Sequence, residues 1–148
     1  MTAFSIAAAA ARSGLPESTL RYWERIGLLK PVAREDSSGH RRYSERDVTT
    51  LETLANLRAV GMSIDDMRSY LDRGSAGAAA AGEQRALFQA HAERMRAEIA
   101  AMRTRLGYLE LKVAYWTARE AGDLDQAAKI ADELVPVIRQ INPKEHHA

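Results

Sequence analysis

The chain has 148 residues, enough for one modest domain with an appended element, and 46% of them are hydrophobic. Its formal net charge is only +1, so binding to a polyanion requires local clusters of positive charge rather than a uniformly basic surface. There is no cysteine, which excludes disulfides, thiolate metal sites, iron–sulfur clusters and thiol-based redox sensing. No apolar run approaches the ~20 residues that span a bilayer, and no signal-peptide pattern is present, so we expect a cytoplasmic protein without membrane attachment.

The first predicted elements are two short helices. Residues 4–12 suit a helix that Ser13 and Gly14 end, and a second helix begins near Ser18 with Pro16 in its first turn. Two short helices joined by a glycine-containing turn are typical of a helix-turn-helix.

The second helix has two opposed faces. Its apolar face recurs at helical spacing and comprises Leu20, Trp23 and Ile26. The other face follows the i, i+3, i+4, i+7 pattern, can donate hydrogen bonds and carries positive charge; it comprises Ser18, Arg21, Tyr22 and Arg25. A helix with such a face on a small hydrophobic body is suited to a DNA groove.

The helical period is lost between residues 30 and 43. Residues 36–39 form a turn, and residues 31–34 and 40–43 on either side are predicted to pair as a small hairpin. A helix begins after Ser44, which can cap it, and carries an apolar stripe of Val48, Leu51, Leu54, Ala55 and Leu57. Gly61-Met62-Ser63 ends that helix and opens a further short helix through Leu71.

The composition changes near residues 74–77, where small residues favour a loop, and we expect a hinge at 75–82. A helix over residues 83–121 would be roughly 58 Å long. It carries apolar residues at alternating spacings of four and three, a heptad seam that predicts pairing with a second copy: Met95, Ile99, Met102, Leu106, Leu109, Val113 and Trp116. Phe88, seven residues before Met95, extends the seam by one repeat. An amphipathic segment, residues 124–141, follows and is expected to be interrupted at Pro136.

These ordered segments carry a family likeness. Residues 4–72 resemble the DNA-binding domain of MerR-family transcription regulators. The matching pieces are the Gly14 turn, the run from Thr19 to Glu24 followed by Gly27-Leu28-Leu29, the run Gly39-His40-Arg41-Arg42-Tyr43, residues 44–47, and Gly61-Met62-Ser63. The long helix is similar to that family's antiparallel dimerisation helix.

The resemblance implies a mainly all-α fold in four parts. Residues 1–74 would form a winged helix-turn-helix, 75–82 a hinge, 83–121 a coiled-coil dimerisation helix and 122–148 a short helical tail. The homodimer would bind a pseudopalindromic, double-stranded promoter and distort it so that RNA polymerase engages. The implied DNA-binding residues are Arg12, Ser18, Thr19, Arg21, Tyr22, Trp23, Arg25, His40, Arg41, Arg42, Tyr43, Arg58, Met62 and Ser63.

The chain departs from the family pattern at two positions. Trp23 stands where a second tyrosine is usual, and Pro16 stands where a serine cap is usual. Trp23 lacks a hydroxyl, so a phosphate contact would need its indole N–H, whereas its place in the apolar stripe favours packing. Without a side-chain cap at Pro16, the second helix is free to enter at a different angle.

Effector and catalytic roles leave alternatives open. Tyr108, Tyr115 and Trp116 suit contact with a small organic effector, although a core role explains Trp116 at its heptad position. No histidine pair has metal-ligand spacing, and no cofactor site or catalytic constellation is present, so an enzyme is not expected. The alternatives are an effector-independent DNA-binding or architectural member, and a coiled-coil module that binds proteins or sequesters small molecules.

Overall fold

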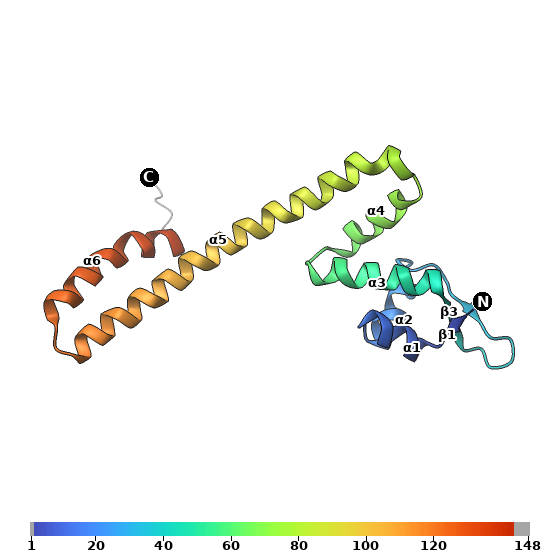
Figure 1. The fold of residues 1–148 in the computed structure, drawn as a ribbon, viewed down its shortest axis with the longest axis horizontal. Helices are drawn as coiled ribbons and strands as arrows, with labels where there is room; N and C mark the ends of the chain where they lie inside the picture. Colours follow the sequence, from blue (N-terminus) through green and yellow to red (C-terminus); the bar gives the residue numbers. More distant parts are fainter. Residues whose placement is uncertain (1, 144–148) are drawn as a thin grey trace. The chain divides into compact units, whose positions relative to one another are not determined.

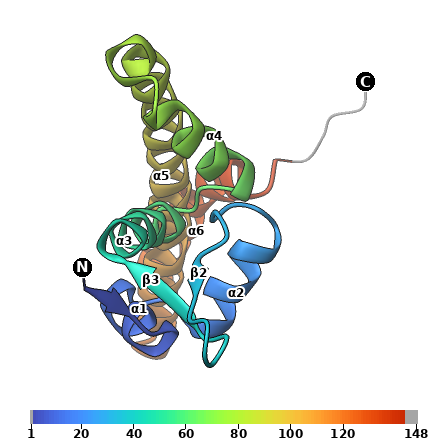
Figure 2. The ribbon, with the colours of Figure 1, turned by 90° about the vertical axis from the view of Figure 1, so that its right-hand side faces the viewer.

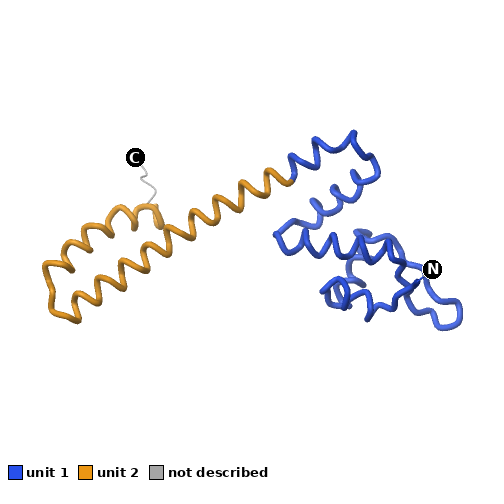
Figure 3. The backbone as a smooth tube through the Cα atoms, viewed as in Figure 1, with its two compact units in different colours: residues 1–87 blue, residues 88–148 orange. Residues whose placement is uncertain are grey.

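The structure, a computed structural model, describes residues 2–143 and divides into two compact units (Figure 3). Residues 1–87 form the first unit and residues 88–148 the second. Of the predicted segments, only the ends at residue 1 and residues 144–148 lie outside the described residues. No helix within residues 2–143 is long and apolar enough to cross a membrane.

The predicted helix-turn-helix is confirmed. Helix α1 spans Ile6–Ser13 and helix α2 spans Glu17–Arg25. The backbone of Gly14 between them has φ of +72°, a conformation that glycine adopts without steric cost. Pro16 caps α2 without a side-chain hydrogen bond, as its lack of a side-chain oxygen requires.

A small antiparallel sheet completes the first unit. Strands β2 (Ala33–Arg34) and β3 (Arg41–Ser44) form the predicted hairpin, and this hairpin is the wing of the winged helix-turn-helix. A third strand, β1 (Ala3–Phe4), pairs with the other edge of β3, and this strand was not predicted. The expected helical placement of Phe4 is therefore wrong: the Ser5 side chain accepts a hydrogen bond from the N–H of Ala8 and so starts α1 two residues later.

Helices α3 and α4 each begin at a serine cap. Helix α3 spans Glu45–Ala59 and opens with a reciprocal pair of bonds, from the Asp47 N–H to the Ser44 hydroxyl and from the Ser44 N–H to the Asp47 carboxylate. Helix α4 spans Ile64–Gly74, and the Ser63 hydroxyl accepts from the N–H of Asp66. Both starts agree with the sequence.

One hydrophobic core holds the first unit together. Helix α1 packs against both α2 and α3, and β3 lies against α1 and α3 (Figures 1 and 2). The largest of the fully buried side chains come from α2, β3, α3 and α4 and are Leu20, Tyr43, Val48, Leu51, Leu54 and Met67. Because α2 and the wing share this core, the position of one is fixed relative to the other.

The expected hinge at 75–82 contains helical turns. A 3₁₀ turn spans Gly77–Ala80, and α5 begins at Ala81 rather than at residue 83. The Gln84 side-chain amide donates to the Tyr70 carbonyl over 2.9 Å, and Arg73 pairs with Glu83 over 2.8 Å. Small residues here permit close packing rather than an open loop.

The second unit is a helical hairpin. Helix α5 runs to Glu120, and α6 (Leu124–Ile141) folds back along its last turns (Figure 1). The buried core comprises Ala118, Ala127, Ile130 and Leu134, with Tyr108, Leu111 and Tyr115 packed against it. The expected interruption at Pro136 is wrong, because α6 is continuous through this proline. The proline removes one backbone donor, and burial of the α6 apolar face outweighs that loss.

Candidate nucleic-acid interface

The polar face of α2 is open to solvent. Ser18, Arg21, Tyr22 and Arg25 are all exposed, whereas Thr19 is partly buried. The Arg25 guanidinium lies 5.4 Å from the centroid of the Tyr22 ring, and Arg21 Nη2 lies 3.0 Å from Glu17 Oε2. Both arrangements are local to the helix and solvent-exposed, so each guanidinium can turn toward a phosphate or a base edge at small cost.

Three predicted DNA-binding side chains are buried instead. Tyr43 has 0% of its surface exposed, Trp23 has 2% and Met62 has 5%. The prediction that these side chains contact DNA is therefore corrected: they are core residues beneath the α2 face and the β2–β3 hairpin. Of the two roles considered for Trp23, phosphate contact and packing, its burial agrees with packing.

The phenol of Tyr43 lies fully inside this core. Its hydroxyl is buried, and no group of residues 2–143 forms a hydrogen bond with it. Burial, followed by the nearby Glu24 charge, raises the pKa of Tyr43 above its ordinary value. The side chain therefore remains neutral at physiological pH and contributes through packing.

The tip of the hairpin is ordered by one carboxylate. Glu35 accepts hydrogen bonds from the Ser38 hydroxyl and from Arg42, each over 2.8 Å. The pKa of Glu35 is lowered below its ordinary value, most by the hydrogen bond from Ser38 and next by the hydrogen bond and positive charge of Arg42. Arg34 donates to the Gly39 carbonyl over 3.1 Å, and His40 is exposed beside it. The wing thus presents basic groups on a hydrogen-bonded turn.

An ion pair ties the wing to α2. Arg41 Nε donates to Glu24 Oε2 over 3.0 Å, and the two side chains retain only 23% and 15% of their exposure. Arg41 was predicted to contact DNA, and no role was predicted for Glu24. The structure directs Arg41 inward, toward Glu24.

The Glu24–Arg41 pair should show strong energetic coupling. In a double-mutant cycle with Glu24→Gln and Arg41→Met, we expect a coupling energy of about 1–2 kcal/mol in urea unfolding, because the charges are partly shielded from water. The exposed Glu17–Arg21 pair is the matched control and should give less than about 0.5 kcal/mol. Equal coupling in the two pairs would contradict a structural role for Arg41.

The remaining predicted contacts lie on α1, α3 and α4. Arg12 pairs with Glu45 over 3.3 Å and with Glu52 over 3.7 Å, and its guanidinium also lies 5.1 Å from the Phe4 ring centroid. These groups hold Arg12 at the surface between α1 and α3. Arg58 is exposed in the last turn of α3, and Ser63 is exposed as the α4 cap.

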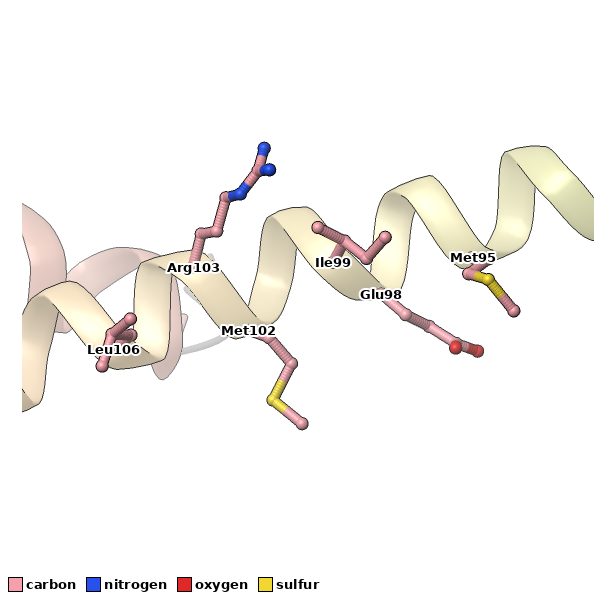
Figure 4. Close-up of a pocket in the computed structure, with 6 residues that line it drawn as sticks. All are labelled: Met95, Glu98, Ile99, Met102, Arg103 and Leu106. Atoms are coloured by element: carbon pink, nitrogen blue, oxygen red, sulfur yellow. The ribbon is translucent and has the colours of Figure 1, made fainter. Parts of the chain in front are cut away.

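The heptad seam of α5 is exposed along its length. Its eight side chains retain between 40% of their surface, at Phe88, and 68%, at Val113. A shallow groove on this seam is lined mainly by apolar side chains, with Glu98 and Arg103 at its sides: Met95, Glu98, Ile99, Met102, Arg103 and Leu106 (Figure 4). On a helical projection the seam lies opposite the stripe that packs against α6. Helix α6 therefore leaves the seam uncovered.

The three candidate effector residues divide between two faces of α5. Tyr108 and Tyr115 pack against the α6 core, whereas Trp116 is exposed on the seam. The rings of Tyr115 and Trp116 meet edge-on with centroids 5.2 Å apart. The ammonium of Lys112 and the guanidinium of Arg119 each lie within 6.0 Å of both ring centroids. Tyr108 and Tyr115 thus lie on a different face of α5 from the exposed side of Trp116.

Comparison with known proteins agrees with this geometry. Residues 4–74 match the family model "MerR HTH family regulatory protein", and residues 48–110 match "MerR, DNA binding". An uncharacterised HTH-type transcriptional regulator of Haemophilus influenzae is 30% identical over 118 residues, which cover 80% of this chain and 87% of the relative. The chain belongs to the MerR family.

Other transcription regulators match this MerR-family chain in sequence or in structure. The Bacillus subtilis regulator AdhR is 44% identical over 66 residues, which cover 45% of this chain and 46% of the relative. The crystal structure of HiNmlR, described as a MerR family regulator lacking the sensor domain and bound to promoter DNA, aligns with a TM-score of 0.65 at 28% identity. That alignment covers 87% of this MerR-family chain and 96% of HiNmlR. The family is a class of transcription regulators, not of enzymes.

Proposed function

We propose that this transcription regulator acts as a homodimer that binds a promoter with two symmetric half-sites. The observation that carries the proposal is the exposed polar face of α2, held beside an ordered wing on one buried core. The alignment with HiNmlR covers 96% of that chain, and HiNmlR was crystallised bound to promoter DNA. This likeness supports promoter binding by the present protein. Helix α2 would enter the major groove, and the wing would contact the flanking backbone.

Dimerisation through the α5 seam is the second part of the proposal. Eight large apolar side chains on one helix stripe form a surface that a monomer would leave in water. Their heptad spacing fits a second helix of the same kind, and we propose antiparallel pairing of two α5 helices. A twofold dimer of this kind presents two α2 helices and so requires a pseudopalindromic site.

The proposed output is a change in DNA shape. Two α2 helices held apart by the dimer would engage both half-sites when the DNA between them is bent or untwisted. RNA polymerase would then read the altered promoter spacing. This step predicts that the protein changes the bend angle of its site, which circularly permuted gel-shift probes measure.

We propose that occupancy by the dimer, without an effector, controls transcription. Tyr108 and Tyr115 pack against the α6 core while Trp116 is exposed on the seam, and this division between two faces of α5 supports this alternative over a pocket that all three side chains line. Pairing at the seam would also cover Trp116. A thermal-shift panel of aromatic compounds should therefore leave the melting temperature unchanged; a compound that raises it and alters DNA affinity would overturn this part.

A gel-shift series tests the function directly. The full-length protein is titrated against the DNA upstream of its own gene and against a scrambled duplex, across a range of salt concentrations. We expect a specific shift at moderate salt that weakens steeply as salt rises, because phosphate contacts release counterions. Equal affinity for both duplexes would contradict sequence-specific regulation.

Arg21 is expected to read a base edge. Arg21→Ala should weaken specific binding by about 1–3 kcal/mol and reduce discrimination against the scrambled duplex. Arg105→Ala, an exposed arginine on α5, is the control and should leave specific affinity unchanged. If Arg21→Ala instead weakens both duplexes equally and lowers the salt slope by about one, Arg21 contacts phosphate.

A further inference from the structure

One side chain of α4 reaches the end of α2. Arg68 Nη2 donates a hydrogen bond over 3.1 Å to the carbonyl of Ile26, 42 residues earlier in the chain. The Arg68 side chain is partly buried, and α4 lies near the loop that follows α2 (Figure 2). The Ile26 carbonyl is therefore the hydrogen-bond acceptor that the structure gives to Arg68.

The accepting carbonyl lies at the negative end of the α2 dipole. Within the last turn, the carbonyls of Tyr22 and Glu24 accept from the N–H groups of Ile26 and Gly27. The Ile26 carbonyl lies beyond this turn and would otherwise depend on water. Gly27, with φ of +75°, redirects the chain there, and a Cβ at this position would lie 3.7 Å from Arg68 Nη1. A cation at this end of a helix is favourable as a charge and as a hydrogen-bond donor.

We propose that Arg68 is a positioning residue for sequence recognition. It fixes the C-terminal end of α2 to α4 and thereby sets the angle at which the α2 face meets base edges. Arg21 and Arg25 project from the same short helix, so a small rotation of its end displaces both guanidinium groups. Arg68 itself faces the protein and does not contact DNA. The inference rests on the proposed function of α2 as the helix that reads DNA.

The test uses three variants of the full-length protein. Arg68→Met removes the donor and the charge but retains the length, and Arg68→Lys restores a charged donor. Arg73→Met is the matched control, because Arg73 lies on the same helix and pairs with Glu83 instead. Each is titrated against a duplex that the wild-type protein enriches from a random library, and against a scrambled duplex, across a salt series.

We expect Arg68→Met to bind the enriched duplex about tenfold more weakly, with scrambled-duplex affinity and salt slope unchanged. Arg68→Lys should recover affinity to within about threefold of wild type, and Arg73→Met should match wild type. Hydrogen exchange of the DNA-free protein should show faster exchange at the C-terminal turn of α2 in Arg68→Met alone.

Each alternative outcome has a distinct meaning. A salt slope lower by about one would make Arg68 a phosphate contact and overturn the positioning role. Wild-type affinity in Arg68→Met, or unchanged exchange in α2, would overturn it as well. If Arg68→Met does not fold, the folded Arg68→Lys protein provides the test. Wild-type discrimination between the enriched and scrambled duplexes by Arg68→Lys supports the positioning role, and loss of that discrimination contradicts it. If the wild-type protein enriches no duplex, the proposed function itself fails and the inference falls with it.

Discussion

Leu106→Glu is expected to convert the protein to a monomer and to weaken binding to its DNA site by at least about 100-fold. The side chain lies in the middle of the exposed α5 seam, and in a twofold dimer the substitution occurs twice. Burying a leucine contributes about 1.5–3 kcal/mol per subunit, and an unpaired carboxylate in its place opposes association further. Sedimentation velocity at micromolar concentration measures the assembly state, and a gel shift measures the loss of affinity.

Ala114→Glu is the control for this change. It adds the same charge to the same helix, two turns further along, at an exposed position off the seam. We expect it to remain dimeric and to bind DNA as the wild type does. A Leu106→Glu protein that stays dimeric would show that the seam is not the interface, whereas a monomer that binds with wild-type affinity would show that DNA binding does not need the dimer.

Trp23→Ala should lower the free energy of unfolding by about 3–5 kcal/mol. The indole has 2% of its surface exposed and belongs to the core that joins α2 to α3 and β3, so its removal leaves a large cavity beneath the α2 face. Urea unfolding followed by circular dichroism measures the change. A loss below about 1 kcal/mol would contradict the burial of this side chain.

Trp23→Phe separates the packing role from DNA contact. Phenylalanine retains much of the buried apolar volume and lacks the indole N–H, so we expect a modest loss of stability with DNA affinity within about twofold of wild type. If DNA affinity fell about tenfold while stability was retained, the indole N–H would be a phosphate contact and its assignment to the core would be wrong.

Local patterns explain which parts of the fold the sequence predicts. The Gly14 turn, the Ser44 and Ser63 caps and the heptad spacing of α5 each depend on residues within a few positions of one another. Such signals act through backbone geometry and helical periodicity, which are readable without knowledge of the tertiary fold. The two-faced character of α2 belongs to the same class, and its exposed face agrees with the structure.

Long-range contacts account for what the sequence does not predict. Strand β1 forms because Phe4 pairs with Tyr43, and the Arg68 bond to Ile26 joins segments with no shared local pattern. Burial of Met62 and Tyr43 depends on the packing of neighbouring elements, although each lies within a motif associated with DNA. At Pro136, tertiary packing of α6 overrides the local preference for a break.

The stoichiometry of the complex on a selected site distinguishes a dimeric, sequence-specific regulator from a monomeric binder. A duplex enriched from a random library by the full-length protein should contain two inverted half-sites, and sedimentation equilibrium should find two chains on each duplex. This result follows from two α2 helices related by a twofold axis. A single half-site bound by one chain, or no enriched sequence at all, would contradict a dimeric, sequence-specific regulator.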